Sequence, residues 1–185
     1  MRSRFIRSSA VATGLLVWTA SAGMAQRNRG LELGGDAAFQ HSESHLPGGI
    51  VSASNSLLLP ISSVRVAFPT DGPFEPEVAA SFTYASAGGR SSSYLAGDVG
   101  LLTELSHDPK GPRWFVRPAL GWQHSTVTSG NSTSRATLGA GIGVRLGITD
   151  RIAARYEARY TYFTETRGVS ANVFGLLAGI SVFTR

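Results

Sequence analysis

The chain has 185 residues, of which 42% are hydrophobic and 16% are charged, and it contains 22 glycines and no cysteine. Its length is that of a single domain, and its apolar content excludes a disordered chain. The absence of cysteine excludes disulfide bonds, thiol catalysis and thiolate metal sites. The formal net charge is +5, and Lys110 is the only lysine among the 17 basic residues.

Residues 1–25 have the pattern of an export signal. Three arginines precede a mostly apolar stretch from 10 to 20, and the small residues Gly23 and Ala25 occupy the −3 and −1 positions of a cleavage site. The stretch is too short to span a bilayer, which takes about 20 residues. Removal of this signal peptide leaves Gln26 first and 14 basic against 12 acidic residues, a net charge of +2. No basic cluster remains, so we expect no nucleic-acid partner.

Residues 26–185 alternate between apolar and polar side chains over segments of about ten residues. Sustained apolar spacing at i, i+3, i+4 and i+7 is absent from this region, so we expect no helix. Strict alternation broken by Gly, Pro and Asp turns is typical of an antiparallel barrel. The pattern predicts one domain with strands near residues 31–40, 58–68, 74–85, 94–105, 114–124, 136–146, 152–163 and 173–183.

Charge is confined to one face of these predicted strands. The face carries seven acids and five arginines, namely Glu32, Asp36, Arg65, Glu75, Glu77, Asp98, Glu104, Arg117, Arg145, Arg155, Glu157 and Arg159. Its other members are mostly Gly and Ala, which suit a crowded interior better than a solvated surface. The opposite face is uncharged, and Ser62 and Phe68 are assigned to it with the large apolar residues. We therefore expect the uncharged face to point outward and paired charges to plug the lumen.

Two tryptophans support a membrane location for the uncharged face. Trp114 and Trp122 are eight residues apart on it, about 26 Å along a strand, which places them near the two membrane interfaces. The predicted fold is all-β, an eight-stranded antiparallel up-and-down transmembrane β-barrel. A soluble periplasmic ligand-binding barrel with the uncharged face inside is the alternative.

The connections are of two alternating kinds. Pro-, Gly- and Asp-rich turns follow the even-numbered strands, whereas links rich in Ser, Gly, Asn and Thr follow the odd ones. Short turns at one end and longer loops at the other are typical of outer-membrane barrels. We expect surface loops, which would carry any partner contacts, at Gln40 to Asn55, Ser86 to Ser93, Thr128 to Ser134 and Thr164 to Asn172.

Candidate metal ligands occur at alternate positions in the first of these loops. His41, Glu43 and His45 would lie on one side of an extended backbone, and imidazole and carboxylate groups suit Zn²⁺ or Cu²⁺. No fourth ligand is apparent, so we interpret the segment as a solvated loop and expect no metal.

His124 and Ser125 are the candidate residues for nucleophilic catalysis. Adjacent residues of a strand point to opposite faces, so these two side chains cannot pair with each other. We expect no catalytic residues and no enzyme activity, with a lipid-modifying hydrolase on the same barrel as an alternative.

Two further motifs have structural explanations. The run from Gly139 to Gly143 resembles a nucleotide-binding loop, but it lies inside an alternating strand and no helix follows it. The glycosylation pattern from Asn131 to Thr133 fits ordinary turn composition. We therefore expect no cofactor.

The segment from Gly139 to Phe163, GAGIGVRLGITDRIAARYEARYTYF, resembles the small OmpA-like outer-membrane β-barrel domains of Gram-negative bacteria. The resemblance covers residues 26–185. It implies an integral outer-membrane protein, exported through the periplasm, in contact with outer-membrane lipid and monomeric, with a structural or envelope role or a surface-interaction role through its loops.

Two positions depart from the family pattern. Members usually end on an aromatic residue that the barrel assembly machinery recognises, whereas Phe183 is followed by Thr184 and Arg185. Pro118 lies in the middle of a strand and cannot donate to the ladder, so we expect a bulge there.

Overall fold

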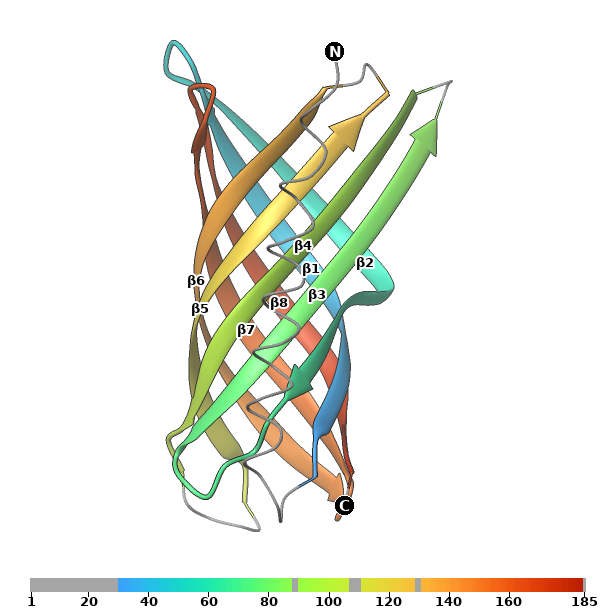
Figure 1. Ribbon diagram of the computed structural model, residues 1–185, viewed down its shortest axis with the longest axis vertical. Coiled ribbons are helices and arrows are strands. Elements are labelled where there is room, and N and C mark those ends of the chain that lie inside the picture. The colour runs from blue at the N-terminus through green and yellow to red at the C-terminus, as the bar shows by residue number, and fades with distance from the viewer. Residues whose placement is uncertain (1–29, 88–89, 107–110, 129–130, 185) are drawn as a thin grey trace, which may run out of the picture.

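A computed structural model of the chain describes residues 30–87, 90–106, 111–128 and 131–184, so the predicted signal peptide lies outside the described residues. Eight antiparallel strands form a closed barrel in which each strand neighbours the next and β8 returns to β1 (Figure 1). The strands are β1 (Glu32–Leu46), β2 (Ile50–Ala67), β3 (Phe74–Ala87), β4 (Arg90–Glu104), β5 (Arg113–Val127), β6 (Ser132–Thr149), β7 (Ile152–Thr166) and β8 (Val169–Phe183). Among these residues, no helix is long and apolar enough to cross a membrane.

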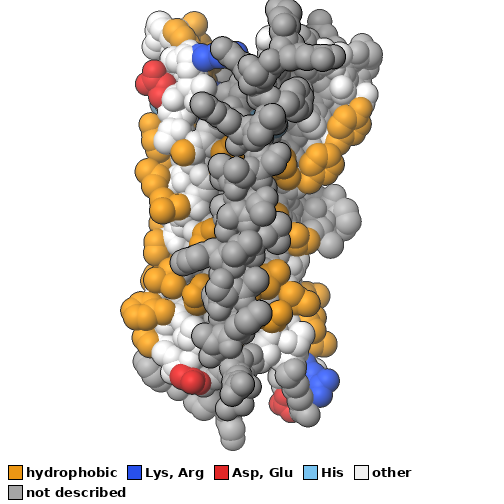
Figure 2. Space-filling model, in the orientation of Figure 1, with side chains coloured by type: hydrophobic (Ala, Val, Ile, Leu, Met, Phe, Trp, Pro, Cys, Tyr) orange, Lys and Arg blue, Asp and Glu red, His pale blue; other side chains and the backbone are white. Residues whose placement is uncertain are grey.

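The uncharged face points outward, as predicted, except that Ser62 and Phe68, both assigned to it, are buried. The exposed large apolar residues of the wall have between 36% and 65% of their surface accessible, with Leu120 at 64% and Phe82 at 65%, whereas Arg117 and Glu77 are almost fully buried. Figure 2 shows hydrophobic side chains along both flanks of the barrel and the visible acidic and basic side chains near its ends. This arrangement excludes the soluble alternative, in which the apolar face would line the interior.

Three of the four expected surface loops are mostly strand, which corrects the sequence-based prediction. Within Gln40 to Asn55, β1 and β2 pair residue by residue up to Leu46 and Ile50, and only residues 47–49 form the turn. Likewise, Ser86 to Ser93 and Thr164 to Asn172 are largely taken up by the strand ends of β3, β4, β7 and β8, whereas in Thr128 to Ser134 only residues 132–134 belong to a strand, β6. Ser, Thr and Asn were assigned to loops, but cross-strand pairing satisfies their backbone groups equally well.

The end of the barrel that carries the 47–49 turn and the β7–β8 turn is called the hairpin end below. Gly48 and Gly49 have φ of 83° and 79°, and Arg167 and Gly168 have φ of 57° and 77°. Two successive residues with positive φ are typical of the tightest β-hairpins. The opposite end, called the turn end, carries the short connections 68–73 and 150–151, as predicted.

The bulge predicted at Pro118 is wrong. β5 and β6 pair continuously through Pro118 and Ala140, and β4 and β5 keep one register on both sides of this position. Pairing between β4 and β5 is interrupted only between the Gly100–Ala119 pair and the Thr103–Val116 pair. The missing N–H of the proline therefore interrupts the ladder to β4 without inserting a residue.

The main irregularity lies in β2. Its register with β1 shifts between Asp36 and Ala38, whose partners Ser63 and Leu58 are five residues apart. Pro60, which has no N–H to donate, lies in this interval. Ser62, assigned to the outward face, is buried instead, and its Oγ donates to the Asp36 carbonyl oxygen at 2.8 Å. The bend breaks the alternation from which its outward position was predicted.

Beyond this bend, β2 separates from β3. Among the described residues, the two strands pair only over Val64–Ala67 and Glu77–Ala80, whereas β3 and β4 pair along their whole length. Figure 1 shows the upper part of β2 running away from β3 toward its hairpin with β1. The wall between β2 and β3 is therefore joined only in its half near the turn end.

Candidate functional site

The lumen near the turn end is filled by arginines that bridge carboxylates. Arg65 of β2 contacts Glu32 Oε1 through Nη1 at 2.7 Å and Asp36 Oδ2 through Nε at 3.1 Å. Its Nη2 donates to Ser181 Oγ at 2.9 Å. All four side chains are buried, so these contacts replace the water that the charges lose on burial.

Arg145 of β6 links this cluster to the facing wall. Its Nη2 lies 2.7 Å from Glu32 Oε2 and 2.6 Å from Glu75 Oε1, and its Nη1 donates to Glu75 Oε2 at 3.1 Å. Glu104 lies 3.5 Å from Nη1. The two-bond contact with Glu75 is the fork geometry that a guanidinium offers and an ammonium does not, which accounts for the use of arginine here.

The middle of the lumen is a second, continuous cluster. Glu77 of β3 contacts Arg117 of β5, with Nε and Oε1 2.6 Å apart, and also pairs with Arg155 of β7. Glu157 lies between Arg155, at 2.6 Å from Nη2, and Arg159, at 2.7 Å from Nε. Strands on opposite sides of the barrel are thus joined through side chains alone.

Phe115 is a buried lumen residue that the sequence reasoning did not single out. Its ring is fully buried, with the guanidinium carbon of Arg155 4.5 Å from the ring centre and that of Arg145 at 5.7 Å. A guanidinium over an aromatic face is attracted by the ring quadrupole. Phe115 shares the alternation phase of Arg117, and this phase was the signal that placed it inside.

Glycines on the lumen face make room for these side chains, as predicted. A Cβ at Gly34 would collide with the Arg65 guanidinium, one at Gly100 with Arg117, and one at Gly141 with Glu157. The run from Gly139 to Gly143 therefore lies inside β6 and serves packing, consistent with the rejection of a nucleotide loop.

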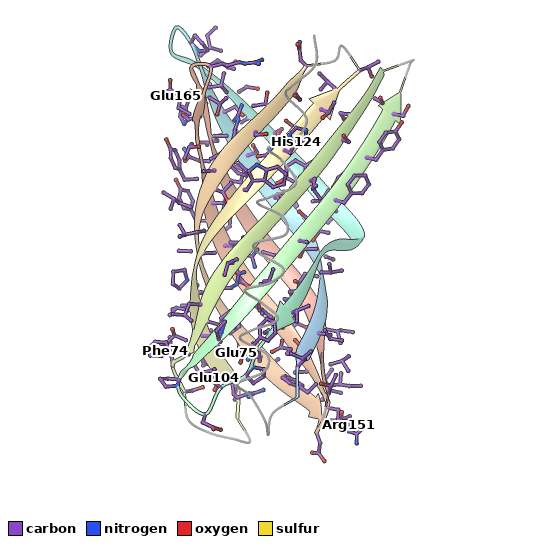
Figure 3. All side chains as sticks on the ribbon, in the orientation of Figure 1. Phe74, Glu75, Glu104, His124, Arg151 and Glu165 are labelled. Atoms are coloured by element: carbon purple, nitrogen blue, oxygen red, sulfur yellow. The ribbon has the colours of Figure 1, made fainter. Side chains whose placement is uncertain are left out.

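The ion pairs divide the lumen into two cavities. The cavity at the hairpin end has a volume of about 440 Å³ and includes Asp98 and Arg159 in its lining. The cavity at the turn end has a volume of about 630 Å³ and includes Glu75 and Glu104, which Figure 3 shows near that end. No lining residue is common to both, so the clusters between them form the predicted plug.

Comparisons with known proteins agree with this architecture. No family model matches the chain, and no curated protein matches it. Among solved structures, Neisserial surface protein A (NspA) is 15% identical, over 83% of this chain and 97% of that one, with a TM-score of 0.63. Ail, the attachment invasion locus protein of Yersinia pestis, is 12% identical, over 83% and 99%, with a TM-score of 0.52. The chain has the fold of the eight-stranded outer-membrane β-barrels. The predicted fold class and the resemblance to small outer-membrane barrels are confirmed, and the apolar outer wall is that of an outer-membrane protein.

The candidate metal residues of this outer-membrane barrel lie side by side on β1 but do not converge. His41 Nδ1 lies 2.8 Å from Asn55 Oδ1, and its Nε2 lies 3.4 Å from Glu43 Oε1. His45 instead contacts Asn172 of β8 at 3.2 Å. Within the described ranges, no three His, Cys, Asp or Glu residues are placed to hold a metal ion.

His124 makes contacts that the sequence reasoning missed. Its Nδ1 lies 2.9 Å from Ser134 Oγ of β6 and its Nε2 lies 3.2 Å from Thr126 Oγ1, while its ring stacks on Trp122 with centroids 5.9 Å apart. Ser125 points the other way and lines the cavity at the hairpin end, as the alternation predicted. His124 and Ser134 are cross-strand partners, so the β5–β6 register was the signal that could have found this pair.

Proposed function

We propose that this outer-membrane barrel is a sealed structural element of the envelope that presents β-hairpins at the cell surface. The observation that carries the proposal is the ion-pair plug. Arg65, Arg117, Arg145 and Arg155 are each at most 2% exposed and join the barrel walls across the lumen, which supports a sealed barrel over a pore. An eight-stranded barrel has an interior that side chains can fill, and this one is filled.

The strand lengths support the surface part of the proposal. The strands contain 14–18 residues, whereas about 9–11 tilted residues span a bilayer. The additional residues lie at the hairpin end, where the β1–β2 hairpin exposes Leu46, Ile50 and Val51 near its tip. Exposed apolar residues on a rigid hairpin suit contact with a surface partner or with neighbouring envelope components.

The proposal includes the route of the protein to the membrane. Cleavage after Ala25 would release the barrel domain, 26–185, into the periplasm, and the barrel assembly machinery would insert it as a monomer. The pairing of β8 with both β1 and β7 supports closure within one chain.

The test is complementation of a strain that lacks the protein. The full chain and a variant with residues 43–53 replaced by Asn-Gly, which keeps the Ser42–Ser54 pair, are expressed, and folding is verified by the heat-dependent mobility of unboiled samples. We expect both forms to restore resistance to entry of the dye N-phenyl-1-naphthylamine, and only the full chain to restore attachment to fixed epithelial cells. Normal dye exclusion and attachment in the deletion strain would contradict the proposal.

A lipid-modifying hydrolase is the second candidate, and the His124–Ser134 contact favours it. Both residues lie on the outward face, where a lipid ester could reach them, and a His–Ser hydrogen bond is the first requirement of an activated serine. The third partner here is the hydroxyl of Thr126 and not a carboxylate. His124 is therefore a weaker base than the histidine of a Ser-His-Asp triad. Release of fatty acid from phospholipid vesicles by the full chain, abolished in both His124→Ala and Ser134→Ala and unchanged in Ser125→Ala, would establish this activity.

A further inference from the structure

The wall between β2 and β3 leaves backbone edges without a strand partner. Pairing stops at Val64 and Ala80, and no pairing of β2 with β3 is described nearer the hairpin end. Phe82 and Tyr84 follow on β3 with side chains 65% and 62% exposed on the outward face, so the open seam begins within the lipid-facing wall. Unpaired backbone groups are tolerated at membrane depth only where they line a polar or water-filled cavity.

The cavity at the hairpin end reaches this seam and passes through the wall. Its lining includes consecutive residues of β3, Ala79, Ala80 and Ser81, and both Ser62 and Ser63 of β2. Consecutive residues of the regularly paired β3 point to opposite faces, so a cavity that touches Ala79, Ala80 and Ser81 extends from the lumen to the outer surface. The buried Ala79 and the exposed Ala80 mark its inner and outer sides.

Small residues and one tryptophan form the outer part of this opening. Ala80, Gly97 and Trp122 are cross-strand partners in one row over β3, β4 and β5, and all three line the cavity. A Cβ at Gly97 would touch only the Ala79 carbonyl oxygen, at 3.6 Å, so the floor of this groove is low. The groove is apolar. Ala80 and Gly97 form its bottom in a single row of residues, and the Trp122 ring forms its side.

The inner part of the cavity carries hydroxyl groups and positive charge beside the buried apolar side chains of Phe163, Ala171 and Leu177. Its lining includes Tyr94 and ten Ser and Thr residues. The ten are at positions 42, 44, 56, 62, 63, 81, 83, 125, 137 and 161. Its charged residues are Asp98, Arg135 and Arg159. Asp98 lies 3.7 Å from Arg159 and also pairs with Arg117, whereas no ion pair of the half-buried Arg135 occurs among the described residues. Among the described residues, the cavity therefore offers one cation without a counter-ion, together with many hydroxyl groups.

We propose that this cavity binds a single-chain anionic amphiphile, such as a long-chain carboxylate, which enters from the bilayer through the seam between β2 and β3. The head group contacts Arg135 and the surrounding hydroxyls, and the chain leaves through the seam over Ala80 and Gly97 against Trp122. The volume of about 440 Å³ lies within the range of small-molecule sites, about 300–1,000 Å³. The one-row groove accommodates one chain, and the uncompensated arginine selects a negative head group.

Trp122 is a reporter for this binding. In Trp114→Phe protein it is the only tryptophan of residues 26–185, and Trp122→Phe leaves Trp114 as the matched control outside the cavity. The exported chain is placed in nanodiscs of zwitterionic lipid and titrated with 9,10-dibromostearate, which quenches indole fluorescence on contact. We expect saturable quenching of Trp122 and only non-saturable quenching of Trp114.

Substitutions separate the head-group site from the groove. Arg135→Gln is expected to weaken saturable binding about tenfold, the effect of losing a charged hydrogen bond, whereas Arg151→Gln at the exposed turn end changes nothing. Ala80→Leu fills the groove and is expected to abolish saturation, whereas Ala140→Leu, at an exposed outward position of β6, does not. The heat-dependent mobility of each variant verifies that it is folded.

Four results would overturn the proposal. The first is the absence of saturable quenching. The second and third are binding of dibromostearyl alcohol, or of a brominated two-chain phosphatidylglycerol, with the same affinity as dibromostearate. The fourth is a dimer, seen by light scattering, whose assembly and not its ligand binding is disrupted by Ala80→Leu. The second would remove the selection of charge, the third the selection of one chain, and the last would make a second copy of the chain the occupant of the seam.

Discussion

Arg155 of β7 and Glu77 of β3 form an ion pair across the lumen, between strands that share no backbone ladder. The Arg155 Nη2 group also donates to Glu77 Oε1 at 3.4 Å and to Glu157 Oε2 at 2.6 Å. Both walls of the barrel are therefore tied to one guanidinium. Because its partners are buried, the removal of this group leaves charges that water cannot reach.

Arg155→Ala is expected to destabilise the barrel by about 1.5–3 kcal/mol, the cost of losing buried hydrogen bonds to charged groups that keep a second partner. In the variant, Glu77 loses Arg155 and retains Arg117, and Glu157 loses Arg155 and retains Arg159. The measurement is thermal unfolding in detergent, followed by circular dichroism and by the loss of heat-dependent gel mobility. Arg151→Ala, which removes an exposed arginine from the turn end, is the control and should leave the midpoint unchanged. Equal midpoints for both variants would contradict the plug.

Two glycines of β6 provide a test of lumen packing. A Cβ at Gly143 would overlap the Phe115 ring and the Tyr156 carbonyl oxygen, whereas a Cβ at Gly147 meets nothing within 4 Å. Gly143→Ala should therefore cost about 1–3 kcal/mol through overpacking. Gly147→Ala should stay within about 0.5 kcal/mol of the wild-type free energy of unfolding. Urea-induced unfolding in lipid vesicles measures both, and a neutral Gly143→Ala would show that the lumen is looser than the structure has it.

The alternation of the sequence was sufficient to predict which face of each strand is inside. Every charged residue assigned to the lumen face lies on that side. A shift of one residue in the register of a strand would move all of its charges to the lipid-facing side, which fixes the orientation of each strand. Ser62 was misplaced because the register shift near Pro60 interrupts the alternation, and alternation alone does not locate a bulge. The strand ends were also missed, because Ser, Thr and Asn suit both a loop and a strand beyond the membrane.

The contacts between side chains of different strands were not predicted, because alternation gives the face on which a residue lies and not its partner. The pairing of Arg155 with Glu77 depends on the stagger of the closed barrel, which brings β3 and β7 to one level. The His124–Ser134 contact depends on the β5–β6 register. The open seam depends on where β2 bends, and Pro60 was its only signal in the sequence.

The lipid-facing belt predicts where a charge is costly. Leu120 is 64% exposed and lies between Trp114 and Trp122 on β5, whereas Val51 is 56% exposed near the tip of the β1–β2 hairpin. Leu120 lies closer to Trp122 than to Trp114, so Leu120→Arg should cost between the value near an interface, about 1 kcal/mol, and the midplane value, about 2–4 kcal/mol, whereas Val51→Arg should cost close to nothing. Reversible unfolding from phospholipid vesicles measures the difference. A similar cost at both positions would place the hairpin inside the bilayer.

The β1–β2 hairpin, which replaces the longest predicted loop, should protect its backbone amides. From Gln40 to Leu46 each residue of β1 has a partner in β2, from Ser56 to Ile50, and residues 47–49 form the turn. Amide exchange requires the ladder to open, so paired amides exchange slowly and those of the turn exchange fast. Hydrogen–deuterium exchange followed by nuclear magnetic resonance in micelles distinguishes them residue by residue. Exchange at His41 and His45 as fast as at Gly48 would show that this segment is a loop, as the sequence predicted. It would contradict the rigid surface hairpin on which the proposed surface role depends.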